Sequence, residues 1–139
     1  MVSRSREETE ALAAQVAAGL RAGDVVYVSG ELGAGKTTFV RGAARALGVE
    51  GPVASPTFTI GHSYAAPVPV AHLDLYRLDG VDAAEWGGLE PYFDGTIAFV
   101  EWPEHGGDLL PAPRVTVTLS HVDENTRRVS ITGADDPRL

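Results

Sequence analysis

The sequence predicts an α/β fold in which a buried strand leads through a glycine-rich loop into a helix. Residues 25–29 are apolar and rich in β-branched side chains, which is typical of a central parallel strand. The glycine-rich residues 30–37 follow directly, and apolar residues at helical spacing continue through residues 39–47 until Gly48. This order of strand, loop and helix is the context in which phosphate-binding loops occur.

A helix is predicted before that strand. Residues 5–8, Ser-Arg-Glu-Glu, match a capping box, in which the first and fourth side chains satisfy free backbone groups at a helix start. Apolar residues then recur at helical spacing up to Leu20, and Gly23 with Asp24 ends the pattern.

After the loop and its helix the chain is predicted to be extended. Residues 57–64 and 70–75 are predicted strands, separated by a proline-rich turn at residues 67–69. A short helix is predicted over residues 82–86, and the two glycines that follow are predicted to interrupt it.

The last third of the chain is predicted to add three strands. Residues 97–101 form an apolar strand that ends in an acid. Residues 115–119 alternate between apolar and polar, and residues 127–132 can return beside them after a turn at 123–125. We expect this hairpin to form one antiparallel edge of the sheet, followed by a frayed polar tail at residues 134–139.

The composition fits one domain spanning residues 1–139. Hydrophobic residues make up 44% of the chain and charged residues 22%, so there is enough apolar material for a core. The lack of cysteine excludes disulfides, thiolate metal sites and a cysteine nucleophile. Residues 1–10 are polar and no apolar run reaches the length of a membrane span, so we expect a soluble, cytoplasmic protein without a membrane partner.

The charge balance argues against direct nucleic-acid binding. The formal net charge is -8, which repels phosphate backbones at long range, so we expect no DNA partner. Lys36 is the only lysine, whereas arginine supplies every other fixed positive side chain. A lysine kept in such a composition indicates a task that needs a compact ammonium group, such as reaching into a phosphate site.

Residues 30–37 match the pattern G-x-x-x-x-G-K-[ST], which predicts a site for the triphosphate and Mg²⁺ of ATP. Glycines allow successive amide N–H groups to converge on phosphate oxygens at the start of a helix. Lys36 is expected to reach the β and γ phosphates, and the Thr37 hydroxyl to bind Mg²⁺. The alternative, a glycine-rich turn that binds nothing, is disfavoured by the flanking strand and helix. The predicted nucleotide-binding residues of the loop are Gly33, Ala34, Gly35, Lys36, Thr37 and Thr38.

Two acidic residues are predicted to complete the site, because Mg²⁺ needs oxygen ligands and an attacking water needs orientation. Glu101 ends one apolar strand, and Asp74 lies near the end of another. The alternative for each is a solvated carboxylate at a strand end. Thr57 lies in an extended segment that could reach the γ-phosphate, although Ser-Pro-Thr is also an ordinary turn.

The other polar and aromatic side chains give weaker signals. His72 is interpreted as a structural histidine, His121 as a surface residue of an edge strand, and Trp86 and Trp102 as core aromatics rather than platforms for base stacking. No zinc site is expected, because no metal-ligand spacing relates the four histidines, which are His62, His72, His105 and His121.

Absent motifs narrow the class of nucleotide protein. A GTPase signature, Asn-Lys-x-Asp, is excluded, because Asn125 is the only asparagine and no second lysine exists. An arginine-rich kinase lid is not evident either, since only Arg114 follows the Glu101 strand before the hairpin. No arginine finger is obvious, although Arg77 is a candidate. We therefore expect the isolated protein to hydrolyse ATP slowly and a partner to supply the missing catalytic groups. A freestanding phosphotransferase and a nucleotide-gated binding module remain as alternatives.

Four motifs in order resemble one family. They are Gly-Glu-Leu-Gly-Ala-Gly-Lys-Thr-Thr-Phe-Val-Arg-Gly at residues 30–42, Ser-Pro-Thr-Phe-Thr at 55–59, His-Leu-Asp-Leu-Tyr-Arg-Leu at 72–78 and Glu-Trp-Pro-Glu at 101–104. Together they resemble the TsaE family (also called YjeE), the bacterial ATPases needed to form threonylcarbamoyladenosine in tRNA. The resemblance implies a small P-loop NTPase fold with a mostly parallel central sheet, antiparallel strands at its edges and flanking helices.

The resemblance also implies partners and a reaction. In this family the protein works with TsaD and TsaB, which transfer the threonylcarbamoyl group to adenosine 37 of tRNAs that read ANN codons. The family's ATP hydrolysis supports turnover of that complex. The acidic net charge agrees with a subunit that contacts proteins first and meets tRNA only through the assembly.

The resemblance assigns site residues by position. Catalytic roles are implied for Lys36, Glu101, Asp74 and, in a switch-like loop, Thr57. Mg²⁺ is implied to be held by Thr37, Glu101 and Asp74, and Trp102 to lie beside the nucleotide. Tyr76 and Arg77 complete a motif without a defined role. The chain departs from the family pattern at residues 85–90 and 60–64, which leaves the phosphate chemistry intact but affects partner contacts.

Overall fold

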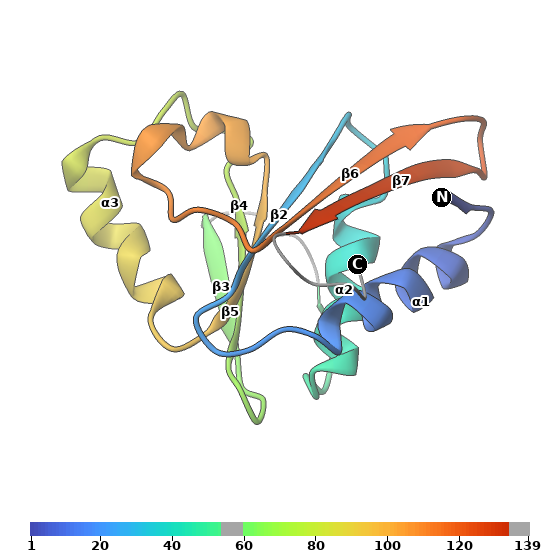
Figure 1. Ribbon diagram of the computed structural model, residues 1–139. Helices are drawn as coiled ribbons and strands as arrows, with labels where there is room; N and C mark the ends of the chain where they lie inside the picture. The colour runs from blue at the N-terminus through green and yellow to red at the C-terminus, as the bar shows by residue number, and fades with distance from the viewer. Residues whose placement is uncertain (54–59, 134–139) are drawn as a thin grey trace.

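The fold is built on one seven-stranded sheet. The computed structural model describes residues 1–53 and 60–133, and its strands follow the spatial order β1-β7-β6-β2-β5-β4-β3 (Figure 1). The strands are β1 (Val2–Ser3), β2 (Val25–Gly30), β3 (Gly61–Tyr64), β4 (Val70–Asp74), β5 (Ile97–Glu101), β6 (Val115–His121) and β7 (Arg127–Gly133).

The centre of the sheet is parallel and both flanks are antiparallel. Strands β6, β2, β5 and β4 are parallel neighbours. Strand β3 runs antiparallel to β4, β7 antiparallel to β6, and β1 antiparallel to β7, so five of the seven strands share one direction. The predicted sheet, mostly parallel with antiparallel strands toward the edges, is confirmed.

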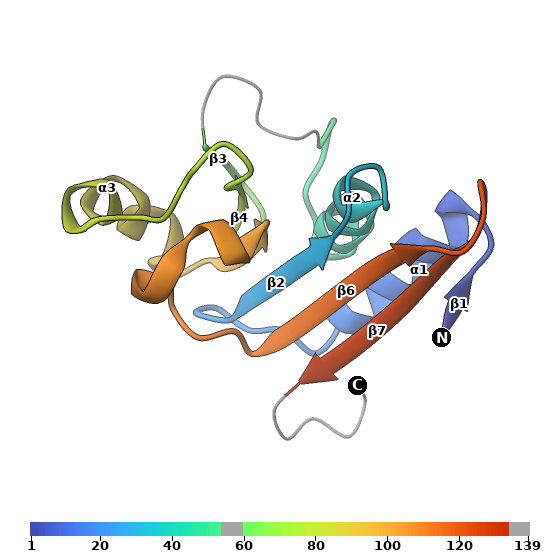
Figure 2. The same ribbon diagram turned by 90° about the horizontal axis from the view of Figure 1, so that it is seen from above.

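Helices cover both faces of the sheet. Helices α1 and α2 lie together on one face, while α3 and the short 3₁₀ helices lie on the other (Figure 2). No helix in the described parts of the chain is both long and apolar enough to cross a lipid bilayer. The helices are α1 (Arg6–Ala17), α2 (Lys36–Ala46), α3 (Ala83–Leu89), η1 (Glu90–Phe93), η2 (Pro103–His105) and η3 (Gly107–Leu109).

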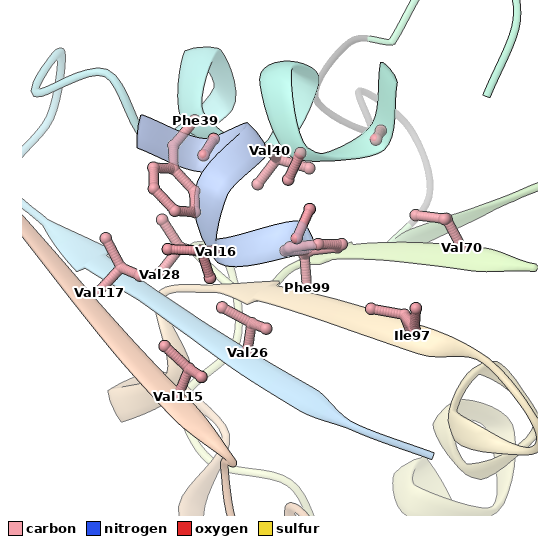
Figure 3. Packing of buried hydrophobic residues seen from close by; sticks show 14 of the residues in the cluster. Val16, Val26, Val28, Phe39, Val40, Val70, Ile97, Phe99, Val115 and Val117 are labelled. Carbon is pink, nitrogen blue, oxygen red and sulfur yellow. The ribbon is translucent and has the colours of Figure 1, made fainter. Parts of the chain in front are cut away.

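The larger core lies between the sheet and the pair α1 and α2. Alternate side chains of a strand point to opposite faces, and Val26, Val28 and Phe99 point to the helical pair, where they meet Phe39 of α2 and Val16 of α1 (Figure 3). All five side chains are buried. The intervening strand residues face α3 and form a second core, which includes Leu73, Val100 and Leu89.

The two helices of the larger core approach closely at Gly42. A Cβ atom at this position of α2 would lie 2.6 Å from the Cα atom of Glu10 in α1. The absence of a side chain therefore sets the distance between the helices, and through it the position of α2, whose first residues belong to the glycine-rich loop.

The N-terminal helix agrees with the prediction, and the predicted capping box agrees in its Ser5 half, while the Glu8 carboxylate accepts a hydrogen bond from the backbone N–H of Arg4. The Ser5 hydroxyl accepts a hydrogen bond of 3.1 Å from the backbone N–H of Glu8. Helix α1 ends at Ala17, before Leu20, and the chain then forms tight turns up to β2.

The hairpin prediction needs one correction. Strands β6 and β7 do pair as a hairpin, but β6 also pairs in parallel with β2 and is an interior strand. The outermost strand on this side is β1, which no pattern in residues 2–3 predicted. A two-residue strand carries too little sequence to show a period, so only its partner strand defines it.

The predicted interruption of the third helix is wrong. Asp82 caps α3 through a reciprocal capping box with Glu85, and the helix continues through Gly87 and Gly88 to the buried Leu89. The contact of Leu89 and the half-buried Trp86 with the sheet outweighs the low helix propensity of two glycines. Of the predicted strand at 57–64, β3 covers residues 61–64, and residues 57–59 lie outside the described ones, as does the tail at 134–139.

Candidate functional site

The glycine-rich loop connects the central strand β2 to helix α2. Gly35 immediately precedes α2 and has a φ of 99°, in the left-handed region that favours glycine. The carboxyl ends of parallel strands and the amino end of the following helix meet here, which is where open α/β sheets bind ligands.

Lys36 is held inside the loop. Its Nζ donates hydrogen bonds to the carbonyl oxygens of Gly30 at 2.7 Å and Glu31 at 2.8 Å, and it lies 4.4 Å from the centre of the Trp102 ring. The residue is only 6% exposed. Burial lowers the pKa of the Lys36 ammonium, while nearby carboxylates, chiefly Glu101 and Asp74, oppose that fall.

Strand alternation brings three polar side chains to the loop. On β5 the residues 97, 99 and 101 share one face, and on β4 the residues 70, 72 and 74 do the same. This is the face that packs on α1 and α2. The parallel register pairs Asp74 with Glu101, so His72, Asp74 and Glu101 gather where the two strands end beside α2.

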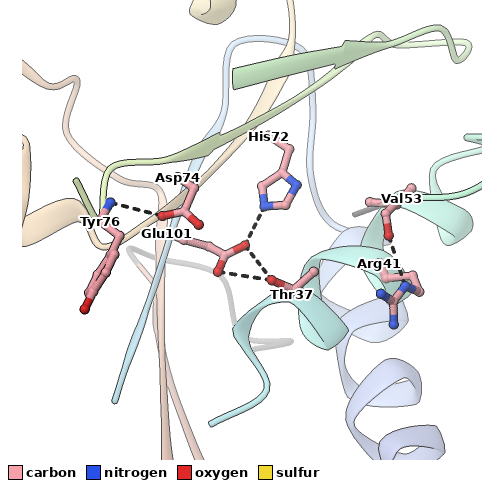
Figure 4. Close-up of polar contacts among 7 residues, drawn as sticks. All are labelled: Thr37, Arg41, Val53, His72, Asp74, Tyr76 and Glu101. Atoms are coloured by element: carbon pink, nitrogen blue, oxygen red, sulfur yellow. Dashed lines mark hydrogen bonds and ion pairs between the residues drawn. The ribbon is translucent and has the colours of Figure 1, made fainter. Parts of the chain in front are cut away.

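Glu101 is the centre of this cluster (Figure 4). The Thr37 hydroxyl donates to its carboxylate, with oxygen–oxygen distances of 3.1 and 3.3 Å. The Nε2 atom of His72 lies 2.5 Å from Glu101 Oε2. The Glu101 side chain is 3% exposed, so a carboxylate is held in a largely dry environment by groups from β4 and α2.

Asp74 stands nearer the solvent. Its Oδ1 accepts a hydrogen bond of 3.0 Å from the backbone N–H of Tyr76. Burial raises the pKa of the Asp74 carboxyl and the Glu101 carboxylate adds to the rise, while the Tyr76 N–H, His72 and Lys36 act in the opposite direction. Two neighbouring carboxylates with one ammonium nearby favour a ligand that brings positive charge.

An aromatic group closes one side of the cluster. Trp102 has a φ of 57°, which is a costly backbone conformation for a residue with a bulky side chain. Its ring lies 5.0 Å from the ring of Tyr76 and 5.3 Å from that of His105, measured between centroids. The pocket beside it has a volume of about 350 Å³ and is lined by Leu32, Gly33, Gly35, Lys36, Thr37, Thr38, Asp74, Tyr76, Glu101 and Trp102.

A second pocket lies on the hairpin side of the same loop. Gly33, Gly35 and Thr38 line both pockets. The second has a volume of about 340 Å³, and its other lining residues are Ser5, Arg6, Thr9, Glu124, Asn125 and Arg127.

The hairpin also fixes the loop. The backbone N–H of His121, at the end of β6, donates to the Glu31 carboxylate at 3.0 Å, and its Nε2 lies 3.3 Å from the carbonyl oxygen of Leu32. His121 is exposed as predicted, but it ends an interior strand instead of lying on an edge strand.

Comparison with known proteins identifies the family. The family model described as "Threonylcarbamoyl adenosine biosynthesis protein TsaE" matches residues 3–129. This chain belongs to the TsaE family.

Individual relatives agree with that assignment. The chain is 41% identical over 128 residues to the tRNA threonylcarbamoyladenosine biosynthesis protein TsaE of Bacillus subtilis strain 168, covering 91% of this chain and 80% of the relative. It is also 41% identical over 122 residues to the protein of that name from Streptomyces coelicolor, covering 82% of each. The crystal structure of Bacillus subtilis YdiB superposes with a TM-score of 0.80 at 34% identity, covering 96% of this chain and 83% of that one. The fold is accordingly an α/β P-loop NTPase fold.

In this TsaE family member one pocket collects most of the predicted site residues. Lys36, Thr37, Asp74, Glu101 and Trp102 all line it. Ala34 does not, because it is buried and its backbone N–H donates to the carbonyl oxygen of Glu31. Thr57 lies outside the described residues. Arg77 is exposed and is absent from the residues that line this pocket.

Two features of the TsaE site were not predicted from the residues. Trp102, interpreted as a core aromatic, is half-buried against the second core, but its ring also lies over the Lys36 ammonium and lines the pocket, a place that only the family resemblance had implied. The interpretation of His72 as a structural histidine accounts for its burial but not for its contact with Glu101. One signal existed for the second, since His72 precedes Asp74 by two residues and must share its face of the strand.

Proposed function

We propose that this chain binds Mg·ATP at the glycine-rich loop and hydrolyses it in the cytoplasm to support the formation of threonylcarbamoyladenosine in tRNA. The observation that carries the proposal is the contact between the Thr37 hydroxyl and the Glu101 carboxylate next to Lys36. A P-loop threonine, a P-loop lysine and an acid at the end of the adjacent parallel strand are the groups that phosphoryl transfer requires.

Lys36 would supply the charge that binds the phosphates. Its ammonium already lies within the loop, held by the carbonyl oxygens of Gly30 and Glu31. Phosphate oxygens are stronger acceptors than these carbonyls, so the ammonium would exchange them for the β and γ phosphates. Backbone N–H groups of Gly33, Gly35 and Thr38 would contact the same phosphates at the start of α2.

The oxygen ligands at the site fit Mg²⁺. Thr37, Glu101 and Asp74 line the pocket and offer hard oxygen atoms. Among the residues that the structure describes, no group of three or more acidic or histidine side chains could hold a metal ion alone. Mg²⁺ commonly combines one or two carboxylates with substrate phosphates and water, so this donor set suits an ion that arrives with a nucleotide. When bound, Mg²⁺ would neutralise charge on the phosphates.

Glu101 and Asp74 would also orient the attacking water. Both carboxylates lie at the strand ends beside Thr37, and Asp74 is the more exposed of the two. A carboxylate oxygen can accept a hydrogen bond from the water and so direct a lone pair of the water oxygen at the γ-phosphate. Thr57 is proposed to approach the same phosphate from its own segment.

The nucleoside would occupy the second pocket. If the γ-phosphate and Mg²⁺ bind beside the acids, on the β5 side of the loop, the other end of a linear triphosphate would point toward β6. The pocket on that side shares Gly33, Gly35 and Thr38 with the first and adds polar side chains from α1 and the hairpin turn. Trp102, on the opposite side, would then cover the phosphates and not the base.

The partners are proposed from the family. The relatives are named as tRNA threonylcarbamoyladenosine biosynthesis proteins. We propose that this chain acts with TsaD and TsaB, and that it meets tRNA through them, since its net charge of -8 opposes direct binding of a polyanion.

Reconstitution tests the proposal. ATP hydrolysis and modified adenosine are measured with and without TsaB, TsaD and tRNA. We expect slow hydrolysis by the chain alone, stimulation by the complex, and modification that depends on this chain. Release of inorganic phosphate without an acceptor separates an ATPase from a freestanding phosphotransferase.

Two variants divide binding from chemistry. Lys36→Ala should weaken nucleotide binding strongly, whereas Glu101→Gln should keep the binding of metal-free nucleotide and lose at least about a hundredfold in turnover, a typical effect of removing one catalytic group. Unchanged hydrolysis in Glu101→Gln would show that this acid has been assigned wrongly. The absence of any nucleotide binding by the parent protein, alone and with TsaB and TsaD, would exclude the whole proposal.

A further inference from the structure

We propose that His72 is a positioning residue that holds the Glu101 carboxylate in the orientation needed for Mg²⁺-dependent nucleotide binding. The role rests on the proposed function, because it concerns how the same site receives Mg²⁺. His72 itself does not line the pocket beside Lys36, so it acts through Glu101.

The contact between the two side chains is short and buried. His72 is 0% exposed, and its Nε2 lies 2.5 Å from Glu101 Oε2. A carboxylate can only accept, so the imidazole must donate from Nε2. Figure 4 shows the ring pointing from β4 at the carboxylate, with Thr37 approaching from α2.

The other ring nitrogen explains what this histidine is for. Among the described residues, Nδ1 of His72 is a buried atom without a hydrogen-bond partner. A buried polar atom without a partner is costly. An aliphatic residue would avoid this cost at a position whose strand neighbour on the same face is the buried Val70. The contact with Glu101, and not packing, therefore accounts for a histidine at position 72.

Two contacts from different elements fix the carboxylate. The Thr37 hydroxyl holds it from α2, and the imidazole holds it from β4. If the Thr37 oxygen were to bind Mg²⁺ instead, the imidazole of His72 would still restrain Glu101. Groups that orient a metal-site residue in this way are commonly worth tenfold to a hundredfold in affinity or activity.

The test compares three variants with the parent protein. His72→Leu removes the donor at similar volume, His72→Gln places an amide N–H near the former Nε2, and Val70→Ala is a control that removes buried volume from the same face of β4. By register Val70 pairs with Ile97, four residues before Glu101. Binding of the non-hydrolysable analogue AMP-PNP is measured by calorimetry with Mg²⁺ and with EDTA, and unfolding temperatures are recorded for all four proteins.

The proposal predicts a specific loss. His72→Leu should bind metal-free AMP-PNP like the parent but lose about tenfold to a hundredfold of the gain in affinity that Mg²⁺ provides. His72→Gln should recover most of that gain. Val70→Ala should unfold at a lower temperature and keep the full Mg²⁺ effect.

A second measurement needs no nucleotide. Nitrogen-15 NMR of the imidazole should show the tautomer protonated at Nε2 in the free protein, and Glu101→Gln should perturb that signal. A parent-like Mg²⁺ effect in His72→Leu, a His72→Gln variant no better than His72→Leu, or a ring protonated only at Nδ1 would each overturn the role of His72. If the parent itself shows no Mg²⁺-dependent binding, the proposed function fails and this role fails with it.

Discussion

At the scale of single residues, the candidate site contains a half-buried carboxylate that destabilises the folded protein when no ligand is bound. Asp74 is half-buried beside Glu101, and its burial raises its pKa. A carboxyl whose pKa is raised on folding is more easily ionised in the unfolded chain, so its charge destabilises the folded state at neutral pH. Positions of this kind are typical of functional sites.

Asp74→Asn should therefore stabilise the nucleotide-free protein. The amide keeps an oxygen for the Tyr76 N–H and removes the buried charge. At neutral pH we expect an unfolding temperature higher by up to a few degrees. The gain should shrink as the pH falls through the raised pKa of the folded state, and vanish below the ordinary value of 3.8, where Asp74 is protonated in both states.

Thermal unfolding from pH 7 down to pH 4 checks this, with Asp79→Asn as the control, because Asp79 is an exposed aspartate of the same segment. A lower unfolding temperature for Asp74→Asn at neutral pH would contradict the argument. The same variant should lose hydrolysis, so stability and activity should move in opposite directions.

At the scale of elements, two glycines in helices have opposite consequences. Gly42 lies where α2 touches α1, and a Cβ there would meet backbone atoms of Glu10 at 2.6 and 2.7 Å. Gly88 lies on the exposed side of α3, and a Cβ there would meet nothing within 4 Å. Backbone atoms of a packed helix cannot move aside cheaply, whereas open space imposes no cost.

The same substitution should therefore change stability in opposite directions. Gly42→Ala should lower the free energy of unfolding by about 1–3 kcal/mol, the usual cost of overpacking. Gly88→Ala should raise it by about 0.5–1 kcal/mol, because alanine loses less backbone entropy in a helix. Urea titrations of both variants measure the two changes. A stable Gly42→Ala protein would mean that the helices separate freely, and the position of the loop would then not depend on α1.

At the scale of the whole molecule, charge is expected to couple the binding of the proposed nucleotide to that of its metal ion. The chain has a formal net charge of -8, and the pocket contains two carboxylates for one lysine. A bare triphosphate would meet repulsion from Asp74 and Glu101 that a bound divalent cation removes. Nucleotide and cation are therefore expected to bind as a pair.

Thermal unfolding with ligands tests that coupling. At a Mg·ATP concentration about a hundred times its Kd, binding to the folded state adds about 2.7 kcal/mol, which corresponds to several degrees for a domain of this size. ATP with EDTA should give a much smaller shift, and Lys36→Ala should show little with either. Equal shifts of the unfolding temperature with and without Mg²⁺ would show that repulsion from the carboxylates does not affect nucleotide binding.

Much of this architecture could be predicted because its signals are local. The strand, loop and helix around residues 25–47 follow from a short apolar run, glycine spacing and a helical stripe, each of which depends on neighbours in sequence. The Ser5 cap and the hairpin of β6 and β7 were also predicted from neighbouring residues. Glu101 and Asp74 could be predicted since an acid at the end of a buried strand is visible in the sequence.

What failed depended on contacts between distant segments. Helix α3 passes through Gly87 and Gly88 because Leu89 packs on the sheet, and β1 exists because β7 offers it an edge. Neither contact can be predicted from helix propensity or from the periodicity of apolar residues.

The sequence alone therefore determined the glycine-rich loop, its lone lysine and the acids at the ends of the neighbouring strands, because each follows from the order of adjacent residues. Only the tertiary structure decided that His72 supports Glu101, that Trp102 lies over Lys36, and that β6 is interior to the sheet. These pairings depend on strand register and on the packing of α2, and both arise from the whole chain closing on its core.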